Sequence, residues 1–110
     1  MLRDQESLID IAKAIQSILR YTKGIDQSAL ETNDEKLSAI LYQIAIIGEA
    51  TKRISPLFRQ KHPEIPWREM AGIRNVIIHE YDQLDFEIIW SVIETKLPEL
   101  LSLIEILLPE

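Results

Sequence analysis

The fold is decided by residues 37–50, which read LSAILYQIAIIGEA. A helix turns by about 100° per residue, so Ile44, Ile46 and Ile47 cannot all share one narrow apolar stripe. A helix that is apolar on more than one side is buried on more than one side. Gly48 has no side chain and would let a second backbone approach closely. This stretch therefore predicts the central helix of an all-α domain.

Apolar periodicity predicts three further helices around this one. The expected helices span about residues 4–22, 33–55, 66–81 and 85–108. A polar connection, with room for one helical turn, is expected at 25–32, and a proline-containing loop at 56–66. Pro98 lies inside the last helix and should kink or restart it. Four helices joined by short connections favour a four-helix bundle, formed as a single domain over residues 1–110.

The composition excludes several classes of site. The 110 residues include no cysteine, so disulfides, thiolate zinc sites and cysteine nucleophiles are excluded together. The two histidines, His62 and His79, lie too far apart in sequence for a zinc motif, and we expect no metal and no cofactor. No apolar run approaches the roughly 20 residues of a membrane span, and charges interrupt the start of the chain. We therefore expect a cytoplasmic protein with no membrane partner.

The charge is distributed unevenly along the chain. The net charge of −6 argues against a nucleic-acid partner, yet residues 52–74 hold six basic side chains against two acidic ones. The functional interpretation is an anion-binding patch for RNA, and the alternative is a solvated basic connection between two helices. The basic residues are Lys52, Arg53, Arg59, Lys61, Arg68 and Arg74.

The candidate site lies in residues 74–81, RNVIIHEY. On a continuous helix Asn75 and His79 are four residues apart and stack one turn above the other. Tyr81 returns to the side of Arg74, whose long side chain can reach the same patch. One side of the helix would thus gather a permanent cation, an amide, an imidazole and a phenol.

These residue types suit phosphate chemistry. Arginine forks onto phosphate oxygens, and histidine can accept or donate a proton near neutral pH. RNA cleavage needs a base, an acid and a cation, which two Arg74–His79 pairs facing each other across a two-fold axis could supply without a metal. Val76 and Ile77 are expected to point away, toward the core. The alternative is that Arg74 and His79 have no catalytic role, because an arginine and a histidine at this spacing also occur as ordinary surface residues.

Residues 72–81, GIRNVIIHEY, resemble the signature of the HEPN superfamily, in particular its HepT-like toxin branch, which carries Arg-x-x-x-x-His-x-Tyr. Other segments resemble the same branch in the same order and cover most of the chain. One departure is Tyr42, where the resemblance leads us to expect a basic residue. The further matching segments are DIAKAI at 10–15, YTKG at 21–24, IIGEA at 46–50, PEIPWR at 63–68 and LPEL at 97–100.

The resemblance implies a four- to five-helix homodimer that acts as a metal-independent ribonuclease toxin. It implies that Arg74 and His79 are catalytic, with Asn75 supporting the motif. It also implies a small nucleotidyltransferase antitoxin that transfers adenylyl groups from ATP to Tyr81. Two alternatives remain open: a non-catalytic helical dimer that binds a nucleotidyltransferase partner or a nucleotide, and a purely structural bundle.

Overall fold

The computed structural model describes residues 2–78 and 83–108, and the regular elements in these two stretches are all helical. The predicted all-α class is confirmed. Within the same stretches no helix is both long and apolar enough to cross a membrane. The elements are α1 (Leu2–Tyr21), α2 (Gln27–Glu31), α3 (Asp34–Lys52), α4 (Pro56–Lys61), α5 (Trp67–Ala71), α6 (Ile73–Ile77), α7 (Phe86–Ser91), the π-helical segment η1 (Val92–Lys96) and α8 (Leu97–Leu107).

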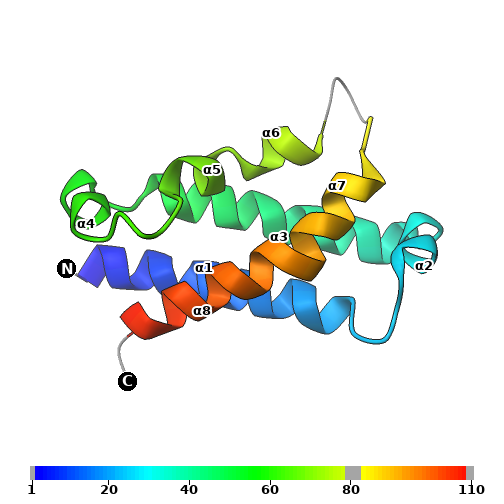
Figure 1. The fold of residues 1–110 in the computed structure, drawn as a ribbon, viewed down its shortest axis with the longest axis horizontal. Helices are drawn as coiled ribbons and strands as arrows, with labels where there is room; N and C mark the ends of the chain where they lie inside the picture. The colour runs from blue at the N-terminus through cyan, green and yellow to red at the C-terminus, as the bar shows by residue number, and fades with distance from the viewer. Residues whose placement is uncertain (1, 79–82, 109–110) are drawn as a thin grey trace.

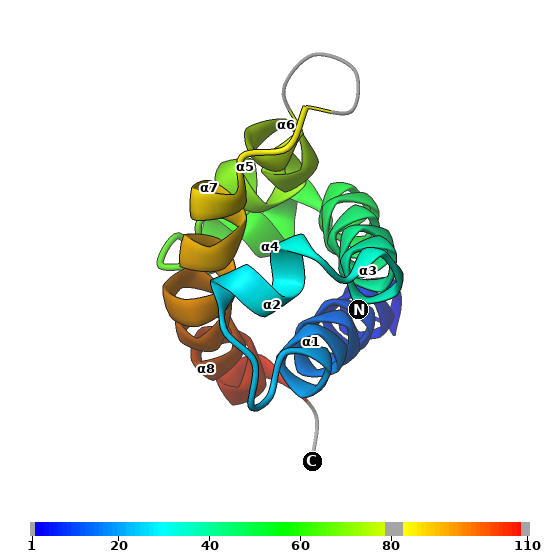
Figure 2. The same cartoon turned by 90° about the vertical axis from the view of Figure 1, so that its right-hand side faces the viewer.

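The chain runs back and forth along the long axis of the molecule (Figure 1). α1 packs along α3, α5 and α6 lie on α3, and the run from α7 through η1 to α8 returns across α1. Viewed from one end, these runs surround the core, and α2 lies across the end of it (Figure 2). Leu30 of α2 is fully buried there. The core between the runs includes Ile11, Ile15, Ile44 and Ile89, each at most 1% exposed.

The central helix α3 begins and packs as predicted. The Asn33 side chain caps it by accepting a hydrogen bond from the Lys36 N–H at 3.0 Å. Gly48 faces the end of α5, where an added Cβ would lie 3.4 Å from the Ala71 oxygen and 3.9 Å from the Met70 oxygen. The predicted close approach of a second backbone is therefore confirmed, and it fixes where α5 ends relative to α3.

The prediction that residues 56–66 form only a loop is wrong, because they contain α4. Ser55 caps this helix by accepting from the Phe58 N–H at 3.2 Å, and Pro56 stands in its first turn, where its missing N–H costs nothing. His62 ends the helix, and its ring packs on Phe58 with 4.6 Å between ring centroids.

The starts of α1 and α4 are tied together by Asp4. This carboxylate is 2% exposed and accepts hydrogen bonds from the backbone N–H and the Oγ of Ser55, each at 2.8 Å. Both carboxylate oxygens are thereby satisfied, as burial of a polar group requires. The pair orients the cap of α4 across a sequence separation of 51 residues.

The prediction of one continuous helix over residues 66–81 is wrong in two places. The helix breaks at Gly72, and α6 ends at Ile77. Ile78 is extended and forms an isolated antiparallel bridge with Leu84. Glycine weakens a helix, and the run of three β-branched residues that ends at Ile78 favours extended backbone.

The last helical run is capped at its start and is disturbed just before its proline. Asp85 accepts hydrogen bonds from two backbone N–H groups in the first turn of α7, at 3.1 and 3.2 Å. The predicted disturbance at Pro98 takes the form of η1, where the Leu97 N–H donates to the Val92 oxygen five residues back. Proline lacks an N–H and crowds the carbonyl four residues earlier, so a wider turn relieves that contact.

Candidate functional site

α6 presents one polar side and one buried side. Arg74 and Asn75 are exposed, whereas Ile73 and Ile77 are 7% and 0% exposed. The predicted polar side is thus present in the described part of the motif. The prediction that Val76 faces the core is wrong, because its side chain is 48% exposed and lines a surface groove.

The polar side of α6 lines a cleft of about 180 Å³, called the Arg74 cleft below. Arg74 and Asn75 enter it from α6, and Glu49 and Lys52 enter it from α3. Two elements that are distant in sequence therefore place charged and amide groups around one hollow. Small residues at the contact between α3 and the end of α5 complete the lining: Ala45, Gly48, Ala71 and Gly72.

The Arg74 cleft holds two cations and one carboxylate among the described residues. The Lys52 Nζ pairs with the Glu49 Oε2 at 3.3 Å, and both side chains are largely exposed, at 61% and 66%. The ion pairs formed between described residues do not include Arg74. The cleft therefore carries a net positive charge, and it offers a planar guanidinium that can fork onto an anion such as phosphate.

The basic residues of 52–74 do not form one surface. Arg59 is used within the fold: its Nη2 donates to the Thr51 oxygen at 2.8 Å and its Nε to the Ile54 oxygen at 3.2 Å. The first carbonyl lies in the last turn of α3 and the second lies just beyond that helix, so Arg59 closes the helix end, as basic side chains often do.

The other basic residues lie in different places. Lys52 lines the Arg74 cleft, Arg53 caps the C-terminus of α3, and Lys61 is exposed at the end of α4. Arg68 lines a separate groove beside α8. The predicted patch is thus divided, and Lys52 is the member that shares a cleft with Arg74.

That separate groove, called the apolar groove below, lies between the α5–α6 run and the η1–α8 run and has a volume of about 760 Å³. Charged side chains of both signs surround it: Glu64, Arg68, Glu69, Lys96 and Glu99. Its apolar lining is Met70, Ile73, Val76, Val92, Leu100 and Leu103.

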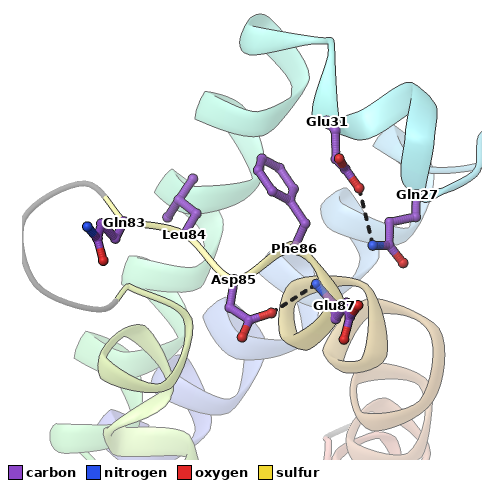
Figure 3. Close-up of a pocket in the computed structure, with 7 residues that line it drawn as sticks. All are labelled: Gln27, Glu31, Gln83, Leu84, Asp85, Phe86 and Glu87. Carbon is purple, nitrogen blue, oxygen red and sulfur yellow. Dashed lines mark hydrogen bonds between the residues drawn. The ribbon is translucent and has the colours of Figure 1, made fainter.

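A third hollow, of about 620 Å³, lies between α2 and the start of α7 (Figure 3). Its walls carry the carboxylates of Glu31, Asp85 and Glu87, and the Gln27 amide donates to Glu31 at 3.2 Å. An acidic pocket repels phosphate. A polyanion is therefore favoured at the positively charged Arg74 cleft and disfavoured at this acidic pocket.

His79 and Tyr81 lie outside the described residues, so their roles stay predictions. The expected stacking of His79 on Asn75 assumed a helix through residue 79, but α6 ends at Ile77. The bridge between Ile78 and Leu84 pairs the two ends of the short segment that carries both residues. Among the described residues, no three histidine, aspartate or glutamate side chains gather closely enough to hold a metal ion.

Glu49 is the site residue that the sequence analysis did not single out. It lies in IIGEA, directly after the glycine at which α3 meets α5. An acidic residue that directly follows a glycine and the apolar run IAII in the central helix is the signal that could have found it. The same glycine places its neighbour at the edge of the cleft.

Comparisons with known proteins identify a family and several relatives of this chain. Residues 11–107 match the family described as Ribonuclease HepT-like. "Putative RNase MJ1380" of Methanocaldococcus jannaschii is 34% identical over 90% of this chain and 91% of its own length. "Probable ribonuclease HepT" of Thermococcus cleftensis is 38% identical over 87% of each chain. "Putative RNase TTE0752" of Caldanaerobacter subterraneus is 36% identical over 82% of this chain and 80% of its own. No solved structure gives a significant match.

Proposed function

The chain belongs to the Ribonuclease HepT-like family, and from that premise we propose that it is an endoribonuclease that cleaves RNA without a metal ion. The observation that carries the proposal is the Arg74 cleft, where Arg74 and Asn75 of α6 meet Lys52 of α3. A phosphodiester fits such a cleft, because a guanidinium binds two phosphate oxygens and an ammonium adds a second positive charge.

The proposed reaction is attack by a ribose 2′-hydroxyl on the adjacent phosphorus. A 2′,3′-cyclic phosphate forms, the bond from phosphorus to the 5′-oxygen breaks, and the leaving oxygen takes up a proton. Arg74 stabilises the negative charge that develops on the phosphorus oxygens. A general base accepts the proton that the 2′-hydroxyl gives up. His79 protonates the leaving oxygen, a task that suits an imidazole near neutral pH.

We also propose that this ribonuclease is the homodimeric, cytoplasmic toxin of a toxin–antitoxin pair. The antitoxin would be a small nucleotidyltransferase that moves an adenylyl group from ATP to Tyr81. The order of motifs along the chain supports this, as does the position of Tyr81 two residues after His79. An added phosphate near Arg74 would compete with the substrate phosphate for the guanidinium.

The ribonuclease proposal is tested with the purified chain and a mixed-sequence, single-stranded RNA oligonucleotide in excess EDTA. Cleavage should persist, and Arg74→Ala and His79→Ala should each lower its rate by at least about 10²-fold. Arg3→Ala, a change of an exposed arginine on α1, is the matched control and should cleave like the parent. Loss of cleavage in EDTA with recovery in magnesium would contradict the proposed mechanism.

The non-catalytic alternative makes a different prediction in cells. Inducing the chain alone should stop growth, and Arg74→Ala should restore it, if the chain acts by cutting RNA. Growth arrest by the parent and the variant alike, with no RNA cleavage by either, would favour a chain that acts only by binding a partner.

A further inference from the structure

Glu49 places a negatively charged side chain in a cleft that is proposed to bind RNA, which is itself negatively charged. The inference drawn from it rests on the proposed ribonuclease function. It contributes the cleft's carboxylate among the described residues, beside Arg74 and Asn75. Its Oε2 contacts the Lys52 Nζ at 3.3 Å, and within the described part of the chain its Oε1 has no hydrogen-bond partner. The Glu49 side chain thus lines the hollow in which a phosphodiester would lie, and the ion pair with Lys52 engages one of its two carboxylate oxygens.

Neither RNA affinity nor folding accounts for this carboxylate. A negative charge in the cleft repels the RNA backbone and reduces the number of phosphate charges that the protein can neutralise. The contact with Lys52 joins two exposed side chains three residues apart, a kind of ion pair that adds little to stability. A carboxylate beside a phosphate-binding guanidinium does, however, suit one chemical task, which is to accept a proton.

We propose that Glu49 is the general base of RNA cleavage. The Glu49 carboxylate takes the proton from the 2′-hydroxyl as the 2′-oxygen forms its bond to phosphorus. The bond from phosphorus to the 5′-oxygen breaks, and His79 gives that oxygen its proton. Exchange with water then returns the proton from Glu49 to solvent and restores the proton on His79.

This assignment changes what one chain contains. Two facing Arg74–His79 pairs would need the partner's His79 as the base. With Glu49 as the base, one chain supplies both the base and the phosphate-binding cation from the Arg74 cleft. The two arrangements differ in whether the reaction needs Glu49, and that difference can be measured.

The test compares Glu49→Gln with the parent in two separate assays. Single-turnover cleavage of the RNA oligonucleotide gives the rate of the chemical step, which should fall by about 10²- to 10⁴-fold. Binding of the 2′-O-methyl form of the oligonucleotide, which has no 2′-hydroxyl to attack, gives Kd. Its Kd should stay constant or decrease, because the variant removes a negative charge from the cleft.

Two further variants separate a base from a merely structural residue. Glu105→Gln makes the same change at an exposed site on α8 and should match the parent in rate and in Kd. Lys52→Gln removes a phosphate-binding charge and should raise Kd, the opposite of the effect at Glu49. Glu49→Asp keeps the carboxylate and should recover part of the rate that Glu49→Gln loses. Thermal unfolding of each variant checks that the fold is retained.

Several outcomes would overturn the assignment. A parental rate in Glu49→Gln would leave the partner's His79 as the base. An equal rise in Kd in Glu49→Gln and Lys52→Gln, with no loss of rate, would mean that Glu49 only holds Lys52 in place. Failure of the proposed function is distinguishable, since Arg74→Ala would then cleave RNA as well as the parent does.

Discussion

A Cβ atom added to Gly48 would lie 3.4 Å from the carbonyl oxygen of Ala71. This contact joins the middle of α3 to the end of α5, one residue before the break at Gly72 that begins α6. Lys52 lies one helical turn beyond Gly48, and Arg74 lies three residues beyond Ala71. The close approach at Gly48 is therefore what brings Lys52 and Arg74 to the same cleft.

Substitutions at Gly48 should separate helix propensity from crowding. Gly48→Ala places a methyl group at an ordinary contact distance and should raise stability by up to about 1 kcal/mol, because alanine is the better helix former. Gly48→Leu should push α5 away, cost about 1–3 kcal/mol and reduce RNA cleavage. Thermal unfolding and a cleavage assay on the same samples measure both effects.

Gly24 provides a control, because alanine there should lower stability, whereas alanine at Gly48 should raise it. An added Cβ there meets nothing within 4 Å, but the backbone has a positive φ of 81°, which a side chain disfavours. Gly24→Ala should therefore lower stability by about 1 kcal/mol and leave cleavage unchanged. A loss of stability in Gly48→Ala as large as that in Gly24→Ala would show that the contact with Ala71 has no room for a methyl group.

Asp4 should matter for stability far more than other acidic residues of α1. Asp4→Ala removes the acceptor for two groups of Ser55 and should lower the free energy of unfolding by about 2–3 kcal/mol. Asp10→Ala, at an exposed site on the same helix, should change it by less than about 0.5 kcal/mol. Chemical unfolding measures the difference, and equal effects would mean that the Ser55 contacts contribute nothing net.

The homodimer proposal can be tested at the apolar groove. Light scattering at micromolar concentration should give the mass of two chains. Val76 is 48% exposed at this groove, whose rim has both signs of charge and can therefore complement a second copy of itself. Val76→Glu should shift the mass toward one chain. Leu57→Glu, at a residue of α4 that is 57% exposed, should not. A parental mass of one chain would refute the dimer itself.

Tyr81 is the proposed point of control. Incubation with the cognate nucleotidyltransferase and ATP should raise the mass of the chain by one or more adenylyl units, and RNA cleavage should fall in proportion. Tyr81→Phe has no hydroxyl to modify, so it should stay unmodified and remain active with the enzyme present. If the nucleotidyltransferase inhibits Tyr81→Phe fully without adding mass, inhibition is by docking alone.

Periodicity and capping predicted much of this fold. The spacing of apolar residues placed α1 and α3 to within a few residues of their observed bounds. The caps at Asn33 and Asp85 were predictable because short polar side chains at those positions satisfy free N–H groups. The close contact at Gly48 followed from the absence of a side chain. Such local rules act within a few residues, and a sequence displays them directly.

The sequence does not reveal features that are decided by two competing local preferences or by packing between distant segments. Three prolines between residues 56 and 66 favour a loop there, although a serine followed by proline also starts a helix, as it does in α4. The helix expected through residue 81 ends at Ile77, where β-branched residues outweigh apolar periodicity. Glu49 was missed at the candidate site because its place in the cleft comes from packing between α3 and α6, which a helical wheel of one segment does not contain.

The π turn before Pro98 has a consequence for chain length. Ile89, Ile93 and Leu97 are all at most 3% exposed, yet eight residues of ordinary α-helix would carry the last about 80° around from the first. The wider turn absorbs this excess, and seven residues of α-helix would end only about 20° short of the same direction. η1 thus accommodates one residue more than the fold needs there. Related chains can differ in length by one residue at this point and still bury the same faces of α7 and α8.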